Sequence, residues 1–258
     1  MDIVYIEKKC KSVLNKSKLG GYTINPYIGC AHNCVYCYAN YYWKNLGIEK
    51  KENEIEIKIN SPDVLCLQLK KLKSKKERVF ISSITDPYQP IEKKYEISRK
   101  IIYLLSKFRF PTSILTKSSL VSRDIDIIKS FDCEVGFTIM CDESWRKHLE
   151  PNASKIDERI GYLEDFSREG IKTFIFIGPI IPEITDNLVE NFPRINVNKI
   201  IFDKLNFHGN EHLEKIKHFS EKFGLNFQKF FDEQYYQEMK KKIINLAKSR
   251  NIKYEFCY

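Results

Sequence analysis

The middle of the chain alternates short apolar runs with longer amphipathic segments. The short runs are rich in β-branched and aromatic residues, as buried strands are, and they lie at residues 78–85, 111–116, 134–140, 173–181 and 199–202. The longer segments carry apolar residues at helical spacing, and they lie at residues 91–108, 123–130, 156–168 and from Asp186 onward. This alternation predicts parallel β/α architecture, in which function lies at the carboxyl ends of the strands.

These segments supply roughly four to five strand–helix units, and the cysteine-rich segment upstream opens one more. The pattern therefore predicts an α/β fold, a partial (β/α)6 barrel of the TIM type. The tail differs, because it reads as two amphipathic helices followed by a closing strand, at residues 211–223, 233–250 and 252–257. We expect three parts: an N-terminal segment at 1–20, the barrel at 21–206, and a helical C-terminal extension packing on the barrel at 207–258.

The 258 residues carry a formal net charge of +9 and 43% hydrophobic residues, an ordinary content for a globular protein. The positive charge is mostly lysine and is spread along the chain. A polyanionic partner such as nucleic acid therefore stays open beside a simply solvated surface. No apolar run approaches the length of a membrane span, and no charged and apolar leader opens the chain. These features predict a cytoplasmic protein with no membrane partner.

Three of the eight cysteines, Cys30, Cys34 and Cys37, follow the spacing C-x3-C-x2-C. A cubane iron–sulfur cluster has four irons and normally takes four thiolates, so three thiolates leave one iron open to a small molecule. A zinc site is the competing interpretation, but His32 lies so close to Cys30 and Cys34 that a closed tetrahedral site would be strained. Eight cysteines in 258 residues are too few for a disulfide scaffold.

The cysteine spacing, with Tyr36 before the last cysteine, resembles the cluster-binding motif of the radical S-adenosylmethionine (radical SAM) enzymes. The surrounding segment at residues 25–39, NPYIGCAHNCVYCYA, resembles the signature of the spore photoproduct lyase-like group. Further segments resemble motifs of the same group, in order along the chain: TDPYQPIE at 85–92, TKSSLVSRD at 116–124, LEPNA at 149–153 with ER at 158–159, and PIIPEITD at 179–186.

The resemblance implies a radical SAM barrel with a [4Fe-4S] cluster on Cys30, Cys34 and Cys37, and with S-adenosylmethionine (SAM) on the open iron. One electron, from a donor such as flavodoxin or ferredoxin, would cleave SAM to a 5′-deoxyadenosyl radical. The implied enzyme abstracts hydrogen from a nucleic acid or nucleotide or, as the alternative, from a peptide or small metabolite. A non-catalytic metal-binding module is a third interpretation.

The resemblance also assigns residues to SAM. Tyr36 would flank the adenine, and Thr85 and Asp86 would meet the amino group or the ribose. Lys117 would neutralise the carboxylate, and Thr138 and Arg159 would contact the ribose and the carboxylate. Structural roles compete for four of them: a packed loop aromatic for Tyr36, a helix cap for Asp86, a surface lysine for Lys117, and pairing with Asp157, Asp165 or Glu150 for Arg159.

One departure from the group concerns the hydrogen-atom donor. Spore photoproduct lyase, which this chain resembles, looks to have a cysteine at the end of its second barrel strand. Alignment on Thr85 and Asp86 puts Ser83 of this chain at that place. A hydroxyl O–H bond is too strong for that donation, so we do not expect thymine-dimer reversal by this route.

The sequence also leads to expectations for three residues that the motifs leave without a role. Strand alternation predicts that Cys141 points away from the barrel interior, as an inert thiol would. Cys257 could return to the barrel mouth with the tail. We expect His32 to hydrogen-bond loop backbone or cluster sulfur rather than to bind iron.

Overall fold

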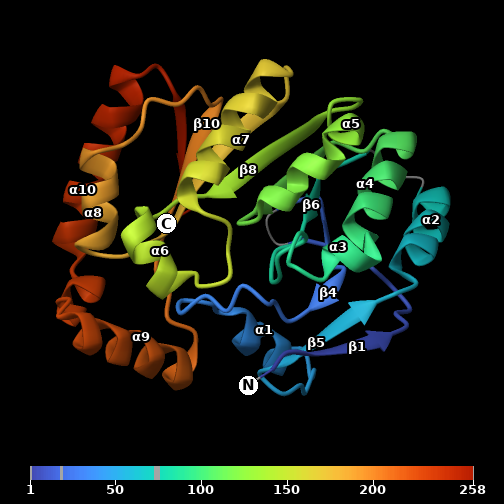
Figure 1. Ribbon diagram of the computed structural model, residues 1–258, viewed down its shortest axis with the longest axis horizontal. Coiled ribbons are helices and arrows are strands. Elements are labelled where there is room, and N and C mark those ends of the chain that lie inside the picture. The colour runs from blue at the N-terminus through green and yellow to red at the C-terminus, as the bar shows by residue number, and fades with distance from the viewer. Residues whose placement is uncertain (1, 18–19, 73–75, 258) are drawn as a thin grey trace.

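A computed structural model describes residues 2–17, 20–72 and 76–257 (Figure 1). Within these residues, the larger sheet has eight strands in the order β11-β10-β9-β8-β7-β6-β3-β2. The strands are β2 (Leu14–Lys16), β3 (Tyr22–Ile24), β6 (Val79–Ile81), β7 (Thr112–Thr116), β8 (Cys133–Thr138), β9 (Lys172–Ile180), β10 (Lys199–Lys204) and β11 (Lys253–Phe256). Neighbours from β3 to β11 pair in parallel, and β2 runs antiparallel to β3.

The strands β3 and β6 to β10 form the partial barrel that the hydrophobic pattern predicts. Helices follow most of these strands and pack outside the sheet, where α7 contacts both β8 and β9 (Figure 1). They are α2 (Ser61–Lys71), α3 (Glu92–Tyr95), α4 (Ile97–Phe108), the 3-10 helix η1 (Ser119–Asp124), α5 (Ile125–Ile128), α6 (Glu143–Leu149), α7 (Ile156–Arg168) and α8 (Ile184–Glu190). The helix expected at residues 156–168 has the predicted bounds.

The helix expected at residues 91–108 is divided in two at Glu96, which has a left-handed φ of 52°. The division has a local cause. The buried Glu92 carboxylate accepts hydrogen bonds from the backbone N–H groups of Ser98 and Arg99, at 3.0 and 3.3 Å, and so satisfies the free amides at the start of α4. In a continuous helix, the Glu92 carboxylate could not reach the N–H groups of Ser98 and Arg99. The break at Glu96 therefore allows Glu92 to cap α4.

A second, smaller sheet has the order β1-β5-β4 and was not predicted. Its strands are β1 (Val4–Lys8), β4 (Tyr27–Ile28) and β5 (Glu54–Lys58). β1 pairs in parallel with β5, while β4 is antiparallel to β5. Because β4 ends two residues before Cys30, this sheet fixes the start of the cysteine segment. The helix α1 (Ala39–Asn45) follows its end.

Along each strand, every second side chain points to the inner face of the sheet. Lys199 and Glu134 lie 3.4 Å apart on this face. Thr138, Phe176 and Ile201 are aligned by the register near the carboxyl ends of β8, β9 and β10. Alternate residues such as Phe202 are fully buried on the outer, helix-covered face. The carboxyl end of the inner face is therefore where side chains from several strands meet the cysteine segment.

The tail contains α9 (Gly209–Phe223), the 3-10 helix η2 (Phe227–Phe231), α10 (Glu233–Ser249) and β11. The predicted closing strand is confirmed, since β11 pairs in parallel with β10. α10 packs beside α8 (Figure 1). None of the helices in the described part of the chain combines the length and apolar character that a membrane span needs.

Candidate functional site

The cysteine segment is a loop between β4 and α1, and we call residues 29–38 the cysteine loop. Cys34 is buried, Cys30 is partly buried and Cys37 is exposed. The loop turns at Gly29, whose φ is +90°, and the Cys37 N–H donates to the Cys34 carbonyl at 3.2 Å. All eight cysteines are free thiols, so this region holds no disulfide framework.

The loop suits a cubane cluster better than a single ion. Among residues 2–17, 20–72 and 76–257, no three His, Cys, Asp or Glu side chains converge as ligands of one metal ion would. That arrangement disfavours a closed zinc site. A cubane binds each thiolate through a different iron, so its cysteines need not converge on one point. Three thiolates on one short loop are the donor set that a cubane cluster takes, and Cys30 and Cys37 are the more exposed of the three.

The segment after β6 holds the cysteine loop from one side. The Thr85 hydroxyl donates to the Gly29 carbonyl at 2.6 Å. Gln89 is fully buried; its amide oxygen accepts from the Ala31 N–H at 2.9 Å, and its amide nitrogen donates to the Gly29 carbonyl at 3.2 Å. Thr85, assigned to SAM by resemblance, thus has a structural partner. Gln89 was not singled out in the sequence, although it stands within the TDPYQPIE segment.

Asp86 is buried below the cysteine loop and binds three neighbouring groups. Its carboxylate accepts from the Tyr88 N–H at 2.9 Å, from the Thr116 hydroxyl at 2.7 Å and from the Lys117 N–H at 2.8 Å. Burial raises the pKa of Asp86, but His32, Lys117 and Thr116 lower it more, so the net pKa lies below its usual range. Asp86 therefore caps the turn after β6 and joins it to β7.

His32 faces Asp86, with its Nδ1 3.3 Å from a carboxylate oxygen, and both side chains are buried. Burial lowers the pKa of His32, but Asp86 and the Cys30 sulfur raise it more, to about 10. His32 thus takes part in an ion pair beneath the loop.

Lys117 lies at the end of β7 and faces the cysteine loop, with its Nζ 5.7 Å from the centre of the Tyr36 ring. The side chain is half-buried. Burial lowers its pKa, but Cys34, Glu150 and Asp86 raise it more, so the ammonium stays charged. Within the described residues no carboxylate lies within ion-pair distance of Nζ. Lys117 is therefore a charged lysine over the Tyr36 ring, without an ion-pair partner among the described residues, and it differs from a solvated surface lysine.

On the other side, Tyr36 and Arg159 converge on Glu150. The Tyr36 hydroxyl donates to one carboxylate oxygen, and Arg159 Nη1 lies 2.6 Å from the other, with both charged side chains fully buried. Burial raises the pKa of Glu150, but Arg159 and Lys117 lower it more, so it stays ionised. Arg159 therefore pairs with Glu150, the tertiary alternative, and not with Asp157 or Asp165. Only the tertiary structure reveals this role of Glu150.

Four buried polar atoms of this site have no hydrogen-bond partner among the described residues. Glu150 Oε2 and His32 Nδ1 face the opposite charge of an ion pair, but Thr138 Oγ1 and Arg159 Nη2 are left without a partner. Arg159 Nη1 donates to the Thr138 carbonyl at 2.8 Å, so the two residues are neighbours. Buried polar groups without partners are rare and each asks for an explanation. Here the explanation we favour is a polar ligand at the carboxyl end of β8.

The C-terminal extension also reaches the loop. His212, in α9, is buried, and its Nε2 lies 3.0 Å from the Tyr36 carbonyl. Its Nδ1 accepts from the His208 N–H at 3.2 Å, so Nε2 carries the proton and donates to the loop. Burial lowers the pKa of His212, which keeps it neutral. This contact was not predicted, because His212 lies far from the loop in sequence and in no motif.

The remaining sequence expectations concern Ser83, Cys141 and Cys257. The Ser83 hydroxyl interacts with Thr23 at 3.3 Å, and the Ser83 carbonyl accepts from the Tyr38 hydroxyl at 2.8 Å. Cys141 is completely buried in the core, in agreement with an inert thiol. Cys257 is exposed directly after β11, where its N–H donates to the Phe202 carbonyl at 2.9 Å.

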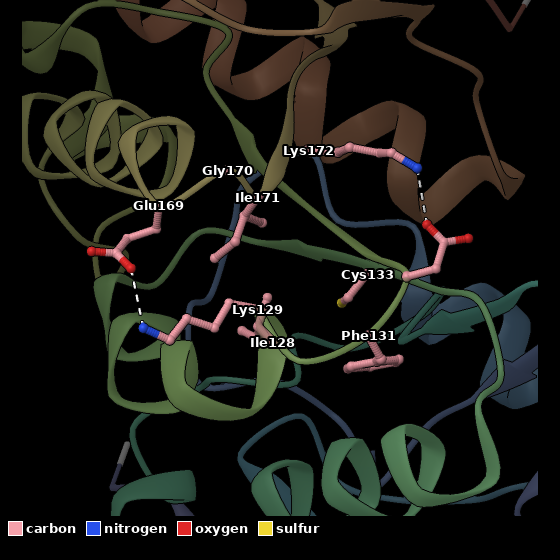
Figure 2. Close-up of a pocket in the computed structure, with 9 residues that line it drawn as sticks. Ile128, Lys129, Phe131, Cys133, Glu169, Gly170, Ile171 and Lys172 are labelled. Carbon is pink, nitrogen blue, oxygen red and sulfur yellow. Dashed lines mark hydrogen bonds and ion pairs between the residues drawn. The ribbon is translucent and has the colours of Figure 1, made fainter.

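A cavity of about 350 Å³ lies elsewhere in the molecule (Figure 2). Cys133 and Lys172, which line it, stand at the amino ends of β8 and β9, opposite the cysteine loop. Two ion pairs border it, Lys129 with Glu169 and Lys172 with Asp132 (Figure 2). This cavity is therefore separate from the residues that the sequence motifs bring together.

A partial parallel barrel with a three-cysteine loop at the carboxyl ends of its strands is characteristic of one class of protein. The chain belongs to the radical SAM superfamily, whose family model matches residues 24–194, and it is a radical SAM enzyme. An uncharacterised protein of Methanocaldococcus jannaschii is 40% identical over 188 residues, which cover 71% of this chain and 70% of that protein. The radical SAM Nalpha-GlyT isomerase of Pseudomonas phage M6 is 27% identical over 176 residues, 66% of this chain but 36% of the phage protein.

Among solved structures, spore photoproduct lyase complexed with dinucleoside spore photoproduct has the same fold. Its TM-score is 0.74 at 16% identity, over 98% of this chain and 82% of that one. A variant of the same lyase has been solved with bound AdoMet as well, at a TM-score of 0.72. The similarity confirms the predicted barrel and the predicted group resemblance in fold.

Proposed function

We propose that Cys30, Cys34 and Cys37 hold a [4Fe-4S] cluster and that the enzyme cleaves SAM reductively to abstract hydrogen from a nucleic acid or nucleotide. When bound, the cluster supplies the electron that breaks the carbon–sulfur bond of SAM. The observation that carries this proposal is Lys117, whose charged ammonium faces the cysteine loop without an ion-pair partner among the described residues. A ligand with a carboxylate on the open side of the loop would provide that partner.

The other proposed SAM contacts follow from the same geometry. Thr138 and Arg159 each have a buried polar atom without a partner, and these atoms would bind the ribose and carboxylate. Tyr36, held by Glu150, would flank the adenine. Thr85 and Asp86 already bind the loop and β7, so we propose that they act on SAM chiefly by keeping the cysteines in place.

We propose a nucleic acid or nucleotide as the substrate because of the net charge of +9 and the fold shared with a lyase solved with a dinucleoside. A small electron-transfer protein such as flavodoxin or ferredoxin would reduce the cluster. The reducing cytoplasm suits an oxygen-sensitive cluster. We further propose that residues 21–206 form the catalytic barrel and that residues 207–258 cover its cysteine-loop side, because His212 contacts that loop.

Anaerobic reconstitution tests the proposal. We expect about four irons and four sulfides per chain, and 5′-deoxyadenosine formation from SAM that depends on dithionite. Replacing Cys30, Cys34 and Cys37 together by alanine should abolish both. The matched control replaces Cys10 and Cys66, free thiols outside the loop, and should keep both.

SAM cleavage that survives the triple replacement would refute the proposal. Deuterium transfer into 5′-deoxyadenosine from deuterated oligonucleotides, but not from deuterated peptides, would support the nucleic acid substrate. The reverse result would favour the peptide alternative.

A further inference from the structure

An acidic side chain at the carboxyl end of β10 has no role in the site described above. Asp203 is partly buried, and its Oδ1 is shielded from solvent without a hydrogen-bond partner in the described part of the chain. An unpaired, shielded carboxylate oxygen is costly, so such a group calls for a functional explanation.

A β-bulge places Asp203. In the register of β9 and β10, Ile177 pairs with Phe202 and Ile180 pairs with Lys204, so two residues of β9 stand opposite Asp203. Those two residues are Gly178 and Pro179. Bulges are common beside active sites, where they redirect a side chain. Here the bulge ends the regular pairing at the inner face, two residues beyond Ile201.

Gly178 makes the space that Asp203 occupies. A Cβ atom on Gly178 would lie 2.4 Å from the Phe176 ring and 3.2 Å from the Asp203 Cβ. The side chains of Phe176 and Asp203 therefore occupy the space beside Gly178, where the Cβ atom of any other residue would clash. Gly178 therefore leaves room for the Phe176 ring and the Asp203 side chain on the same side of the bulge.

The charged group nearest in sequence does not neutralise Asp203. Lys204 forms an ion pair with Glu233 of α10 at 3.0 Å, and its Nζ lies 5.5 Å from the Tyr236 ring centre. Burial raises the pKa of Asp203 to about 6, against the lowering effect of the Lys204 N–H and ammonium. Burial raises the pKa values of Tyr38 and Cys257, and the charge of Asp203 adds to the rise of each.

Exposed aromatic rings lie near this acid, since the charge of Asp203 acts on one of them, Tyr38. Tyr38 directly follows Cys37, and Tyr38, Tyr41 and Tyr42 are 41%, 40% and 38% exposed. Their ring centres lie 5.3 to 5.5 Å from that of His208. Planar rings can stack on exposed tyrosines, and a carboxylate in an apolar setting can accept a hydrogen bond. Together these groups are suited to a flat heterocycle with a hydrogen-bond donor on its edge.

We infer that Asp203 recognises the substrate by accepting a hydrogen bond from a ring N–H of its nucleobase, while the base stacks against the exposed tyrosines Tyr38, Tyr41 and Tyr42. This inference rests on the proposed function and adds to it the residue that selects the base. Thymine, uracil and guanine carry a ring N–H at neutral pH, whereas cytosine and adenine do not. Cytosine and adenine donate only from an exocyclic amino group, which projects beyond the ring edge. An acceptor placed at hydrogen-bond distance from the ring N–H would therefore select the first class and fix its orientation at the barrel mouth.

Oligonucleotide binding to the cluster-reconstituted full chain tests the inference. The probes are two fluorescein-labelled single strands of about 12 nucleotides, alternating thymine with guanine or cytosine with adenine, in lithium buffer that keeps guanine strands unfolded. They match in length, charge and purine content, so backbone contacts contribute equally. By fluorescence anisotropy we expect the wild type to bind the thymine–guanine strand about tenfold more tightly, as a hydrogen bond to a charged group would provide.

Asp203→Ala and Asp203→Asn should each reduce this preference to about twofold or less, by weakening binding of the thymine–guanine strand. Asp203→Asn is the variant to use if alanine impairs folding, which thermal melting will reveal. Glu255→Gln is the matched control, because Glu255 belongs to the next strand and pairs with Lys199 at 3.8 Å, and it should keep the full preference. The preference should also be weaker at about pH 5 than at pH 7.5, because protonation removes the charge of the acceptor.

Equal binding of both strands by the wild type, or a preference that survives both Asp203 variants, would overturn the inference. Binding of neither strand would also overturn it. Wild-type 5′-deoxyadenosine formation is measured on the same preparation. If SAM cleavage is intact while the base preference is absent, the assignment of Asp203 fails and the proposed function stands.

Discussion

Glu150 and Asp203 are both shielded carboxylates, yet their surroundings move their pKa values in opposite directions. Burial acts against the charge of each. For Glu150, Arg159 and Lys117 outweigh burial and keep the pKa low. For Asp203, burial dominates and raises the pKa to about 6. The difference is an ion pair: Arg159 pairs with Glu150, whereas Lys204, the cation next to Asp203, pairs with Glu233. Ionised Glu150 therefore favours the folded state, and ionised Asp203 disfavours it.

Asp203→Asn should therefore stabilise the protein at pH 7.5. The folded-state pKa is raised above the usual 3.8, so the ionised group costs stability above pH 6 and costs nothing below about pH 4. Allowing for partial exposure, we expect a gain of about 1 kcal/mol, or a rise of about 2–4 °C in Tm. Thermal melts against the wild type at pH 7.5 and 4.5 measure it. Glu255→Gln should change Tm little, and an equal gain for Asp203→Asn at both pH values would contradict the assignment.

The connection between α6 and α7 shows how one element holds another. Arg146 Nη1 donates to the carbonyls of Glu150, Pro151 and Ala153, which fixes the shape of the connection. The connection then binds the cysteine loop: the Leu149 carbonyl accepts from the Val35 N–H at 2.9 Å, and Asn152 donates to the Ala31 carbonyl at 2.9 Å. The buried ion pair of Glu150 with Arg159 anchors this connection to α7.

Arg159→Met should destabilise the protein strongly, because it leaves the Glu150 carboxylate buried without a cation. Removing one member of a buried pair typically costs about 3–5 kcal/mol. The double variant Arg159→Met with Glu150→Gln removes the charge as well and should recover most of that loss. Urea denaturation of the three proteins measures the difference. Equal stability of the single and double variants would show that the pair does not act as described.

At the scale of the whole molecule, the cysteine loop is enclosed by segments from the entire chain. The segment after β6 binds it through Gln89, the connection after α6 through Asn152, and the C-terminal extension through His212. Three separate parts of the sequence thus hold one short loop. A loop held this way keeps its cysteines in place before any cofactor binds.

His212→Leu should loosen the loop without unfolding the barrel. It removes one buried hydrogen bond, worth up to about 1.5 kcal/mol, so amide exchange over residues 34–42 should accelerate by up to about tenfold. Hydrogen–deuterium exchange with mass spectrometry measures it. His218→Leu is the matched control, since His218 is exposed on the same helix. If both variants exchange alike, the extension does not restrain the loop.

Local pattern was enough to predict the barrel strands, the helix at 156–168 and the cysteine triplet. A buried strand or an amphipathic helix has a period that is readable over a few residues, and ligand spacing lies within one loop. The same approach missed β1, β4 and β5, because short strands carry little periodicity and their pairing joins residues far apart in sequence. It also missed the break at Glu96, which depends on the backbone hydrogen bonds of a carboxylate.

The cysteine spacing and the motifs are local features of the chain, so they are enough to assign the class of this enzyme. The construction of the site depends on contacts that form only in the folded protein. Glu150 joins Tyr36 to Arg159, and Gln89 and His212 bind the loop, across separations that no local pattern encodes. Asp203 stands in no motif at all. It became notable only because a bulge and a glycine place it where its Oδ1 has no hydrogen-bond partner among the described residues, since burial and pairing are properties of the folded chain.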